Sequence, residues 1–336
     1  MTIQACLSNI RIYWLAYMPK AACCIILALI FNYCFEAAAD QKRIPIKIAT
    51  NDWASQIILS YAIGSVLQNQ GYIVKYQSTS LKQQWGGLRL GHLHLQLEVW
   101  QYSMAKDFNR MVAKNVILDA GPHAANTRED WWYPSYIKKL CPELPDWQAL
   151  NKCSQLFSTP QSGNKGVYYT GPWISDEGIR IRVFKLNYRL ISLDAQSLNK
   201  RLIKAVHNKQ PIILLNWTPN WTDNRIKGEF VEFPEFSQQC ITDRSWGVNP
   251  TEINDCGAPK KGWLKKAANP SFPLNWPCAY QFIQNISFTS DMIAEAAALY
   301  EYDKFSYNES AIKWLEKYKT SWQQWLPECM TTSSSK

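Results

Sequence analysis

Four of the 16 tryptophans in this 336-residue chain follow or end segments with the pattern of buried strands. An indole ring carries negative charge density on its faces, so several indoles around one point attract a cation that has no hydrogen to donate. A quaternary ammonium is such a cation, and four contacts at the upper end of about 0.5–2 kcal/mol each together reach the roughly 8 kcal/mol of micromolar binding. A tryptophan can also pack in a core or support a sugar, but four at equivalent strand ends favour a cation site. The four residues are Trp53, Trp100, Trp173 and Trp217.

The segments around these tryptophans predict an α/β protein with two units in which strands and helices alternate. Alternation with short turns is typical of a parallel sheet covered by helices, and such sheets bind ligands beyond the carboxyl ends of their strands. Two such edges facing each other would bring the four indoles together. A stretch rich in aromatics, prolines and turns, 121–165, separates the units. The predicted strands are 44–50, 72–76, 93–100, 166–171, 186–192 and 211–217, and the predicted helices are 57–71, 81–90, 175–184, 195–208, 289–300 and 308–325.

Acidic residues near the predicted cage could hold the charge of a cation or accept a hydrogen bond from a hydroxyl. Glu98 lies two residues before Trp100 on the same face of its strand, and Glu129 and Asp130 precede an aromatic pair. A salt bridge to a nearby basic residue is the simpler role for these acids. A ligand carboxylate would instead need donors, which the first N–H groups of a helix after Trp53 supply. The candidates for holding either end of a ligand are Ala54, Ser55, His123, Arg128, Glu129, Tyr133 and Asn216.

The N-terminal segment and the cysteines predict export. An apolar run over residues 21–35 follows basic residues and precedes three alanines, which is the pattern of a signal peptide over 1–39, with a retained membrane anchor as the alternative. Six of the ten cysteines remain in the mature chain, an even number that suggests disulfides in the periplasm. The pairs closest in sequence are Cys141 with Cys153 and Cys240 with Cys256, and Cys278 pairs with Cys329 if the C-terminal helix docks nearby.

Several classes of function lack the residues that they need. The net charge of +9 comes from scattered lysines and arginines, which does not favour a nucleic-acid surface. The sequence has no Gly-rich nucleotide motif, no Gly-x-Ser-x-Gly elbow and no Cys-x-x-Cys metal pair, so we expect no cofactor, no metal and no enzymatic activity. A receptor for sugars or peptides is the main alternative to a cation-binding protein, ahead of a secreted hydrolase.

Longer stretches of the chain resemble the substrate-binding proteins of ABC importers for glycine betaine, choline and related methylated amines. This resemblance implies a two-lobed periplasmic binding protein of type II, with a mostly parallel sheet covered by helices in each lobe and the ligand in the cleft between them. Trp53, Trp100 and Trp217 match the cage positions of the family, whereas Trp173 directly follows Pro172 and departs from the usual spacing. The stretches are NDWASQ (51–56), LEVW (97–100), TREDWWYPSYI (127–137), CPELPDWQALNKC (141–153), NWTPNW (216–221), GEFVEFPE (228–235) and DCGAPKKGWLKKA (255–267).

The resemblance also implies an organisation and partners for the chain. We expect a monomer that binds a methylated amine, with a betaine as the first expectation, and delivers it to an ABC permease and its ATPase on separate chains. Trp221 is expected to pack behind the loop that carries Trp217, which Pro219 fixes. The predicted divisions are a signal peptide over 1–39, a first lobe over 40–133 and 260–329, a second lobe over 134–259 and a tail over 330–336.

Overall fold

A computed structural model describes residues 44–173 and 177–331 of the protein. The predicted signal peptide therefore lies outside the described residues. In the two described ranges, no helix is both long enough and apolar enough to cross a membrane.

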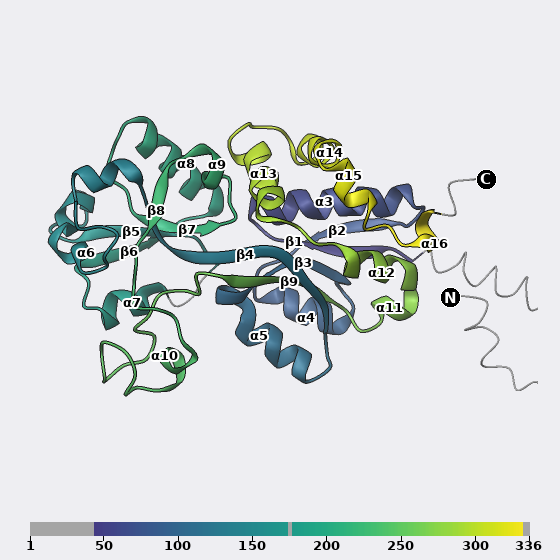
Figure 1. The fold of residues 1–336 in the computed structure, drawn as a ribbon, viewed down its shortest axis with the longest axis horizontal. Helices are drawn as coiled ribbons and strands as arrows, with labels where there is room; N and C mark the ends of the chain where they lie inside the picture. Colours follow the sequence, from purple (N-terminus) through teal and green to yellow (C-terminus); the bar gives the residue numbers. More distant parts are fainter. Residues whose placement is uncertain (1–43, 174–176, 332–336) are drawn as a thin grey trace, which may run out of the picture.

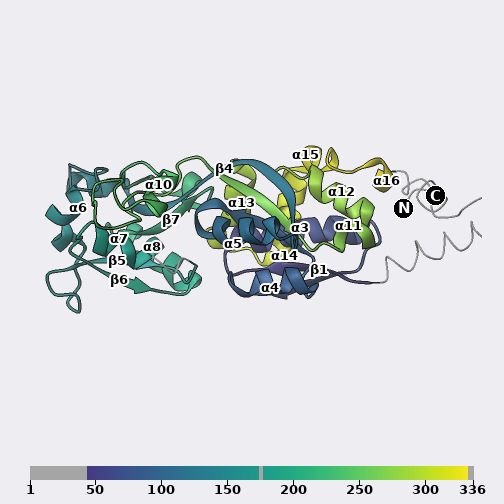
Figure 2. The same ribbon diagram turned by 90° about the horizontal axis from the view of Figure 1, so that it is seen from below.

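One continuous series of strands runs through both halves of the molecule. Neighbouring strands follow the order β2-β1-β3-β9-β4-β7-β5-β6, and β8 pairs with β4. We call the part built on β2, β1, β3, β9 and the start of β4 the first lobe, and the part built on the end of β4 with β5 to β8 the second lobe (Figures 1 and 2). The strands are β1 (Ile46–Thr50), β2 (Val74–Ser78), β3 (Leu95–Trp100), β4 (Leu118–Pro134), β5 (Gly166–Thr170), β6 (Tyr188–Ser192), β7 (Leu214–Thr218), β8 (Gly228–Phe230) and β9 (Gly262–Ala268).

The long strand β4 belongs to both lobes. It pairs with β9 up to Thr127 and with β7 from Arg128 onwards, so the chain crosses between the lobes without leaving the strand. The sequence predicts turns from residue 121, where Gly121 and Pro122 occur. In the structure, Gly121 has a φ of 98°. The strand continues through these residues, and the pairing of β4 with β9 shifts its register on either side of Pro122. The division of the chain at 133/134 and at 259/260 stays a prediction.

The predicted parallel strands are present in both lobes. β1 pairs in parallel with β2 and β3, and β5 pairs in parallel with β6 and β7. The antiparallel partners are β9 and β4 in the first lobe and β4 with β7 and β8 in the second. The carboxyl ends of β1, β3, β5 and β7 therefore define the edges where the tryptophans were expected.

Helices cover the sheet of each lobe. In the first lobe, α3 packs against the sheet and also against α13 and α14, so it is buried nearly all round instead of along one stripe (Figure 1). The main helices are α3 (Ala54–Asn69), α4 (Gln83–Leu90), α5 (Gln101–Ala113), α7 (Glu177–Val183), α8 (Ala195–His207), α12 (Pro277–Asn285), α13 (Ser290–Glu301) and α14 (Tyr307–Lys317). The shorter ones are η2 (Ser135–Lys139), α6 (Ala149–Lys152), η3 (Ser154–Phe157), α9 (Thr222–Arg225), α10 (Gln238–Thr242), α11 (Phe272–Asn275), α15 (Lys319–Gln323) and α16 (Glu328–Thr331).

The helix predicted over 308–325 is two helices. The backbone leaves the helical region at Tyr318, with φ of −105° and ψ of 24°, and α15 begins at the next residue. The side chain that anchors α14 in the core is the fully buried Trp314, whose Nε1–H donates to the carbonyl of Met292 at 2.8 Å.

Both lobes contain disulfide bonds. The bonds Cys141–Cys153 and Cys240–Cys256 are both formed in the second lobe, as predicted. Cys278 on α12 is bonded to Cys329 on α16, which confirms that the C-terminal segment docks on the first lobe. With all six cysteines of the described residues in disulfides, none of them is a free thiol.

Candidate ligand-binding site

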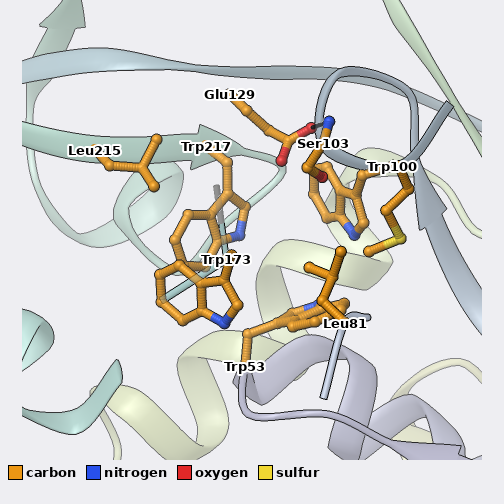
Figure 3. Close-up of a pocket in the computed structure, with 9 residues that line it drawn as sticks. Trp53, Leu81, Trp100, Ser103, Glu129, Trp173, Leu215 and Trp217 are labelled. Atoms are coloured by element: carbon orange, nitrogen blue, oxygen red, sulfur yellow. Dashed lines mark hydrogen bonds between the residues drawn. The ribbon is translucent and has the colours of Figure 1, made fainter. Parts of the chain in front are cut away.

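The four tryptophans meet at one cavity between the lobes (Figure 3). Trp53 follows β1 and Trp100 ends β3 in the first lobe, while Trp173 follows β5 and Trp217 lies in β7 of the second lobe. The space between the four indoles measures about 340 Å³, and part of it is open to solvent. Its lining consists of Trp53, Leu81, Trp100, Ser103, Met104, Glu129, Trp173, Leu215 and Trp217.

The two indoles of the first lobe are tied to one carboxylate. Glu98 is fully buried on β3, and its Oε2 accepts hydrogen bonds from Trp53 Nε1 at 2.7 Å and from Trp100 Nε1 at 3.1 Å. The hydroxyl of Ser55 donates to the same oxygen at 3.0 Å. Burial raises the pKa of Glu98 to about 7, against the opposite effect of these three hydrogen bonds. Glu98 therefore lies behind the indoles, and within residues 44–173 and 177–331 it forms no salt bridge of the kind considered from the sequence.

The two indoles of the second lobe contact each other. The rings of Trp173 and Trp217 pack edge to face, with centroids 5.0 Å apart and planes at 80°. Trp173 Nε1 also donates to Asp52 Oδ1 of the first lobe at 2.5 Å, so this hydrogen bond spans the cleft. Trp173 thus reaches the cavity despite its departure from the usual spacing.

A network of asparagines shapes the loop that follows Trp217. Asn216 Nδ2 donates to Thr222 Oγ1 at 2.9 Å, and Asn220 Nδ2 donates to Asn216 Oδ1 at 2.9 Å. The peptide bond before Pro219 is cis. Trp221 is 1% exposed and packs in a hydrophobic cluster to which both lobes contribute, so it lies behind the loop as expected from the sequence. Asn216 therefore orders the loop and is directed at Thr222 and Asn220.

One carboxylate faces the cavity itself. Glu129 on β4 is buried, and its Oε2 accepts a hydrogen bond from the backbone N–H of Ser103 at 3.2 Å (Figure 3). The nine lining residues include no lysine, arginine or histidine. The cavity thus combines four indoles with an acid, which suits a positively charged group and offers no basic partner to a ligand carboxylate.

Two of the predicted ligand-binding residues lie close to the cavity without lining it. Ala54, the first residue of α3, lines an adjoining cavity of about 190 Å³ that shares Trp53, Trp173 and Trp217. Ser55 is 1% exposed and directs its hydroxyl at Glu98. Ser55 therefore bonds the same carboxylate oxygen as the two first-lobe indoles.

The structure places Tyr133 away from the cavity, which corrects its prediction as a ligand-binding residue. Tyr133 is fully buried in the core of the second lobe together with Trp131. It shares the face of β4 with Glu129 but lies four residues further along, about 13 Å at the rise of a strand. The alternation along β4 correctly predicts the face on which Tyr133 lies. Its distance from the cleft depends on where β4 passes from one lobe to the other, which the alternation does not reveal.

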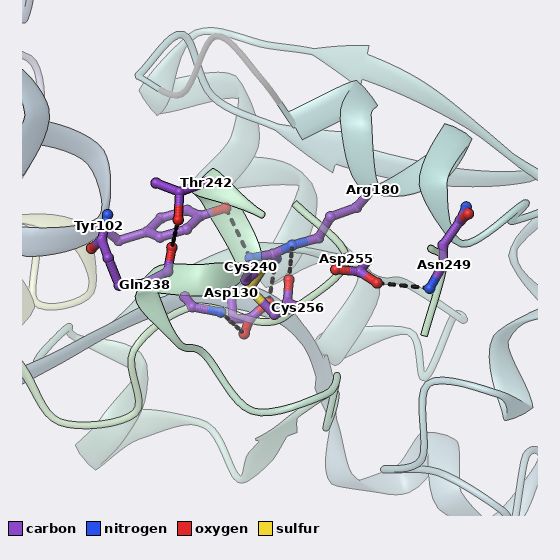
Figure 4. The surroundings of a disulfide bond; sticks show 10 residues. Tyr102, Asp130, Arg180, Gln238, Cys240, Thr242, Asn249, Asp255 and Cys256 are labelled. Atoms are coloured by element: carbon purple, nitrogen blue, oxygen red, sulfur yellow. Dashed lines mark hydrogen bonds and ion pairs between the residues drawn. A yellow bond between two sulfur atoms is a disulfide. The ribbon is translucent and has the colours of Figure 1, made fainter. Parts of the chain in front are cut away.

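The other polar candidates have structural partners. Asp130 is buried and pairs with Arg180 Nη1 at 2.6 Å, beside the Cys240–Cys256 disulfide (Figure 4). Arg128 pairs with Glu232 at 2.9 Å and lies 3.6 Å from Asp130. His123 is held between the carbonyl of Leu97 and the N–H of Phe288, and burial with the neighbouring Lys266 lowers its pKa to about 3. Asp130 and Arg128 thus form contacts within the second lobe, and His123 forms contacts within the first lobe.

Four lining residues were not predicted. Ser103 and Met104 lie in the first turn of α5, directly after Trp100, so the rule that ligands bind beyond strand ends could have found them. Leu215 lies two residues before Trp217 on β7 and shares its face. Leu81 lies in the loop before α4, and no sequence pattern indicates it.

Comparisons with known proteins identify the family of the chain. Residues 44–317 match the family described as the substrate binding domain of ABC-type glycine betaine transport systems. The trimethylamine N-oxide-binding protein of Pelagibacter ubique (strain HTCC1062) is 37% identical over 298 residues, which cover 85% of this chain and 91% of that protein.

Solved structures share the fold at low identity. The glycine/betaine/L-proline-binding protein ProX of Borrelia burgdorferi has a TM-score of 0.67 at 15% identity, over 86% of this chain and 99% of that one. The lactococcal OpuAC in its closed form with glycine betaine has a TM-score of 0.63 at 13% identity, over 84% and 99%. The fold is therefore the two-lobed type II binding-protein fold expected from the resemblance. The chain is a solute-binding protein and not an enzyme, and it belongs to the family of substrate-binding domains of ABC-type glycine betaine transport systems.

Proposed function

We propose that this protein captures one methylated amine, trimethylamine N-oxide, in the cavity between its lobes and delivers it to an ABC permease. The observation that carries the proposal is the convergence of four indoles, two from each lobe, on a single small cavity. A trimethylammonium group has no N–H to donate, so dispersion and cation–π contacts with the ring faces are what can hold it. Both lobes contribute rings, so the ligand is completely enclosed only when they are together.

The remaining lining residues favour a ligand without a carboxylate. Glu129 would repel the carboxylate of glycine betaine, and the nine lining residues contain no basic side chain to offset that repulsion. The hydroxyl of Ser103 is a donor at the same edge of the cavity and could bond the oxygen of an N-oxide. The 37% identical relative is named for binding trimethylamine N-oxide, which supports this ligand over a betaine.

The cellular context of the proposal follows from the family. A permease and an ATPase on separate chains would take up the ligand from the closed binding protein. The apolar run at 21–35 supports export to the periplasm through a signal peptide cleaved after Ala39. We propose that the mature protein works as a monomer with one ligand site.

Isothermal titration of the purified protein with trimethylamine N-oxide, choline, glycine betaine and a control sugar tests the proposal. We expect micromolar or tighter binding of trimethylamine N-oxide and at least tenfold weaker binding of glycine betaine, because the latter brings a carboxylate to Glu129. Trp217→Ala should abolish the binding heat, whereas Trp246→Ala, on a surface turn of the second lobe, should preserve it. Binding of the sugar alone, or binding that survives Trp217→Ala, would contradict the proposal.

A further inference from the structure

The buried carboxylate of Glu98 has a geometry that a purely structural acid does not need. Its Oε2 accepts hydrogen bonds from both first-lobe indoles of the cavity, Trp53 and Trp100, and from Ser55. Glu98 does not itself line the cavity. We propose that Glu98 is a positioning residue for ligand binding, which fixes the two indoles and strengthens their attraction for a cation. The inference rests on the proposed function and deepens it.

The positioning effect follows from the single donor of each indole. An indole has one N–H, so a hydrogen bond at Nε1 fixes the rotation of the ring about the bond that joins it to its Cβ. Trp53 and Trp100 come from different strand ends, and sharing one acceptor atom fixes the angle between their faces. Both rings are at least nine-tenths buried, so packing and hydrogen bonding hold the same orientation. The first lobe therefore presents a preformed half of the cage before any ligand arrives.

The electrostatic effect follows from burial. A hydrogen bond from Nε1–H to an anion moves electron density towards the ring, which makes the ring face more negative. No cation contributes to the pKa of Glu98, and its Oε1 has no hydrogen-bond partner within the described residues, so the charge is not neutralised locally. A charge in a low-dielectric environment acts over a longer range than one in water. Above about pH 7, where Glu98 is ionised, its charge therefore adds attraction for a trimethylammonium group on the other side of the indoles.

A double-mutant cycle separates this role from general structural support. Glu98→Gln keeps the size of the side chain and removes its charge, and Trp53→Phe keeps an aromatic ring and removes its N–H. We expect about tenfold weaker binding of trimethylamine N-oxide for each single variant in calorimetry. The double variant should be much less than a hundredfold weaker, because the second change removes a hydrogen bond that the first has already weakened. Asp255→Asn, which neutralises another buried carboxylate far from the cavity in the second lobe, is the matched control and should bind normally.

A spectroscopic measurement reads the hydrogen bonds without any ligand. In a ¹H–¹⁵N spectrum of tryptophan-labelled protein, the Nε1–H signals of Trp53 and Trp100, assigned from the Phe variants, should lie downfield as donors to a carboxylate. Both should move upfield together in Glu98→Gln, while the other indole signals stay in place. If Glu98→Gln does not fold, Glu98→Asp serves instead, because it keeps the charge but retracts the carboxylate by one methylene.

The outcomes are distinct. Additive effects in the cycle, or binding by Glu98→Gln within twofold of the unmutated protein, would overturn the positioning role. Failure of the unmutated protein to bind any methylated amine would instead contradict the proposed function. In that case the ¹H–¹⁵N spectrum of Glu98→Gln alone tests whether Glu98 fixes the two rings. Unchanged Nε1–H signals of Trp53 and Trp100 would overturn that claim as well.

Discussion

At the scale of residues, the cavity is defined by a small set of side chains with one kind of chemistry. Four indoles supply faces with negative charge density, and Glu129 supplies the one carboxylate among the nine lining residues. Behind them, Glu98 links Trp53 to Trp100. The cavity is thus complementary to a compact cation, which we propose it holds without direct hydrogen bonds to its methyl groups.

The raised pKa of Glu98 predicts a pH-dependent stability. Burial lifts this pKa from 4.5 to about 7, so the folded protein holds the carboxyl protonated below about pH 7 and ionised above it. The contribution of protonated Glu98 to the free energy of unfolding is therefore fully present below about pH 4.5 and is lost as the pH rises through about 7. A shift of this size corresponds to about 3 kcal/mol. Urea denaturation should show that Glu98→Gln, which cannot ionise, gains stability relative to the unmutated protein between pH 4.5 and 8. Parallel pH profiles for the two proteins would show that the carboxyl is not perturbed.

The sequence is informative about the tryptophans and less so about their support. Trp53, Trp100, Trp173 and Trp217 can be found because strand ends are recognisable from alternation and because indoles are rare in loops. Glu98 is recognisable as an acid near Trp100, but its bond to Trp53 depends on the packing of α3 on the sheet, which no local pattern encodes.

At the scale of elements, the strand β4 connects the two lobes and carries residues with opposite roles. Glu129 faces the cavity, whereas the neighbouring Asp130 points into a buried network. Asp130 pairs with Arg180, accepts the N–H of Ala258 at 3.2 Å and lies beside the disulfide that holds the return of the chain (Figure 4). This network fixes the end of the crossing strand within the second lobe.

Removal of Asp130 should destabilise the protein severely. Asp130→Ala leaves the guanidinium of Arg180, whose side chain is 4% exposed, without its carboxylate, which costs about 3–5 kcal/mol. Lys138→Ala is the matched control, because it breaks the exposed pair with Glu229 and should cost less than about 1 kcal/mol. Chemical denaturation of the two variants measures the difference. Equal losses would show that the buried pair is not a major contributor to stability.

The elements themselves could be predicted better than their pairing. Hydrophobic alternation locates β1 and β3, and short apolar or aromatic runs locate β5 and β7. The glycines at 71 and 91, both with positive φ, mark the ends of α3 and α4. The 17-residue β4 was hidden by Gly121 and Pro122, because a strand with register shifts has no regular alternation. Tyr133 was assigned to the site for the same reason, since the extent of β4 sets its distance from the cleft.

At the scale of the whole molecule, several contacts hold the lobes together around the cavity. Trp173 donates to Asp52 across the cleft, and Arg225 of α9 pairs with Asp303 beyond α13 at 3.3 Å. The rings of Trp221 and Tyr302 stack with centroids 6.1 Å apart. These contacts join residues that are far apart in sequence and belong to different lobes.

The hydrogen bond between Trp173 and Asp52 should contribute to ligand retention. Asp52→Ala removes the acceptor for an indole that also lines the cavity, so we expect about fivefold weaker binding of trimethylamine N-oxide through a faster dissociation rate. Stopped-flow fluorescence measures that rate. Asp107→Ala, which breaks only an exposed pair with Arg110 on α5, should leave the rate unchanged. An unchanged rate in Asp52→Ala would mean that this contact does not stabilise the closed form.

A crystal structure of the protein with trimethylamine N-oxide is the most direct test of a methylated-amine cage between the lobes. We expect the trimethylammonium group within about 6 Å of the ring centroids of Trp53, Trp100, Trp173 and Trp217, with its oxygen towards Ser103. A ligand bound elsewhere on the molecule, or a cavity occupied by a group that bonds polar side chains and leaves the indole faces uncovered, would contradict this assignment.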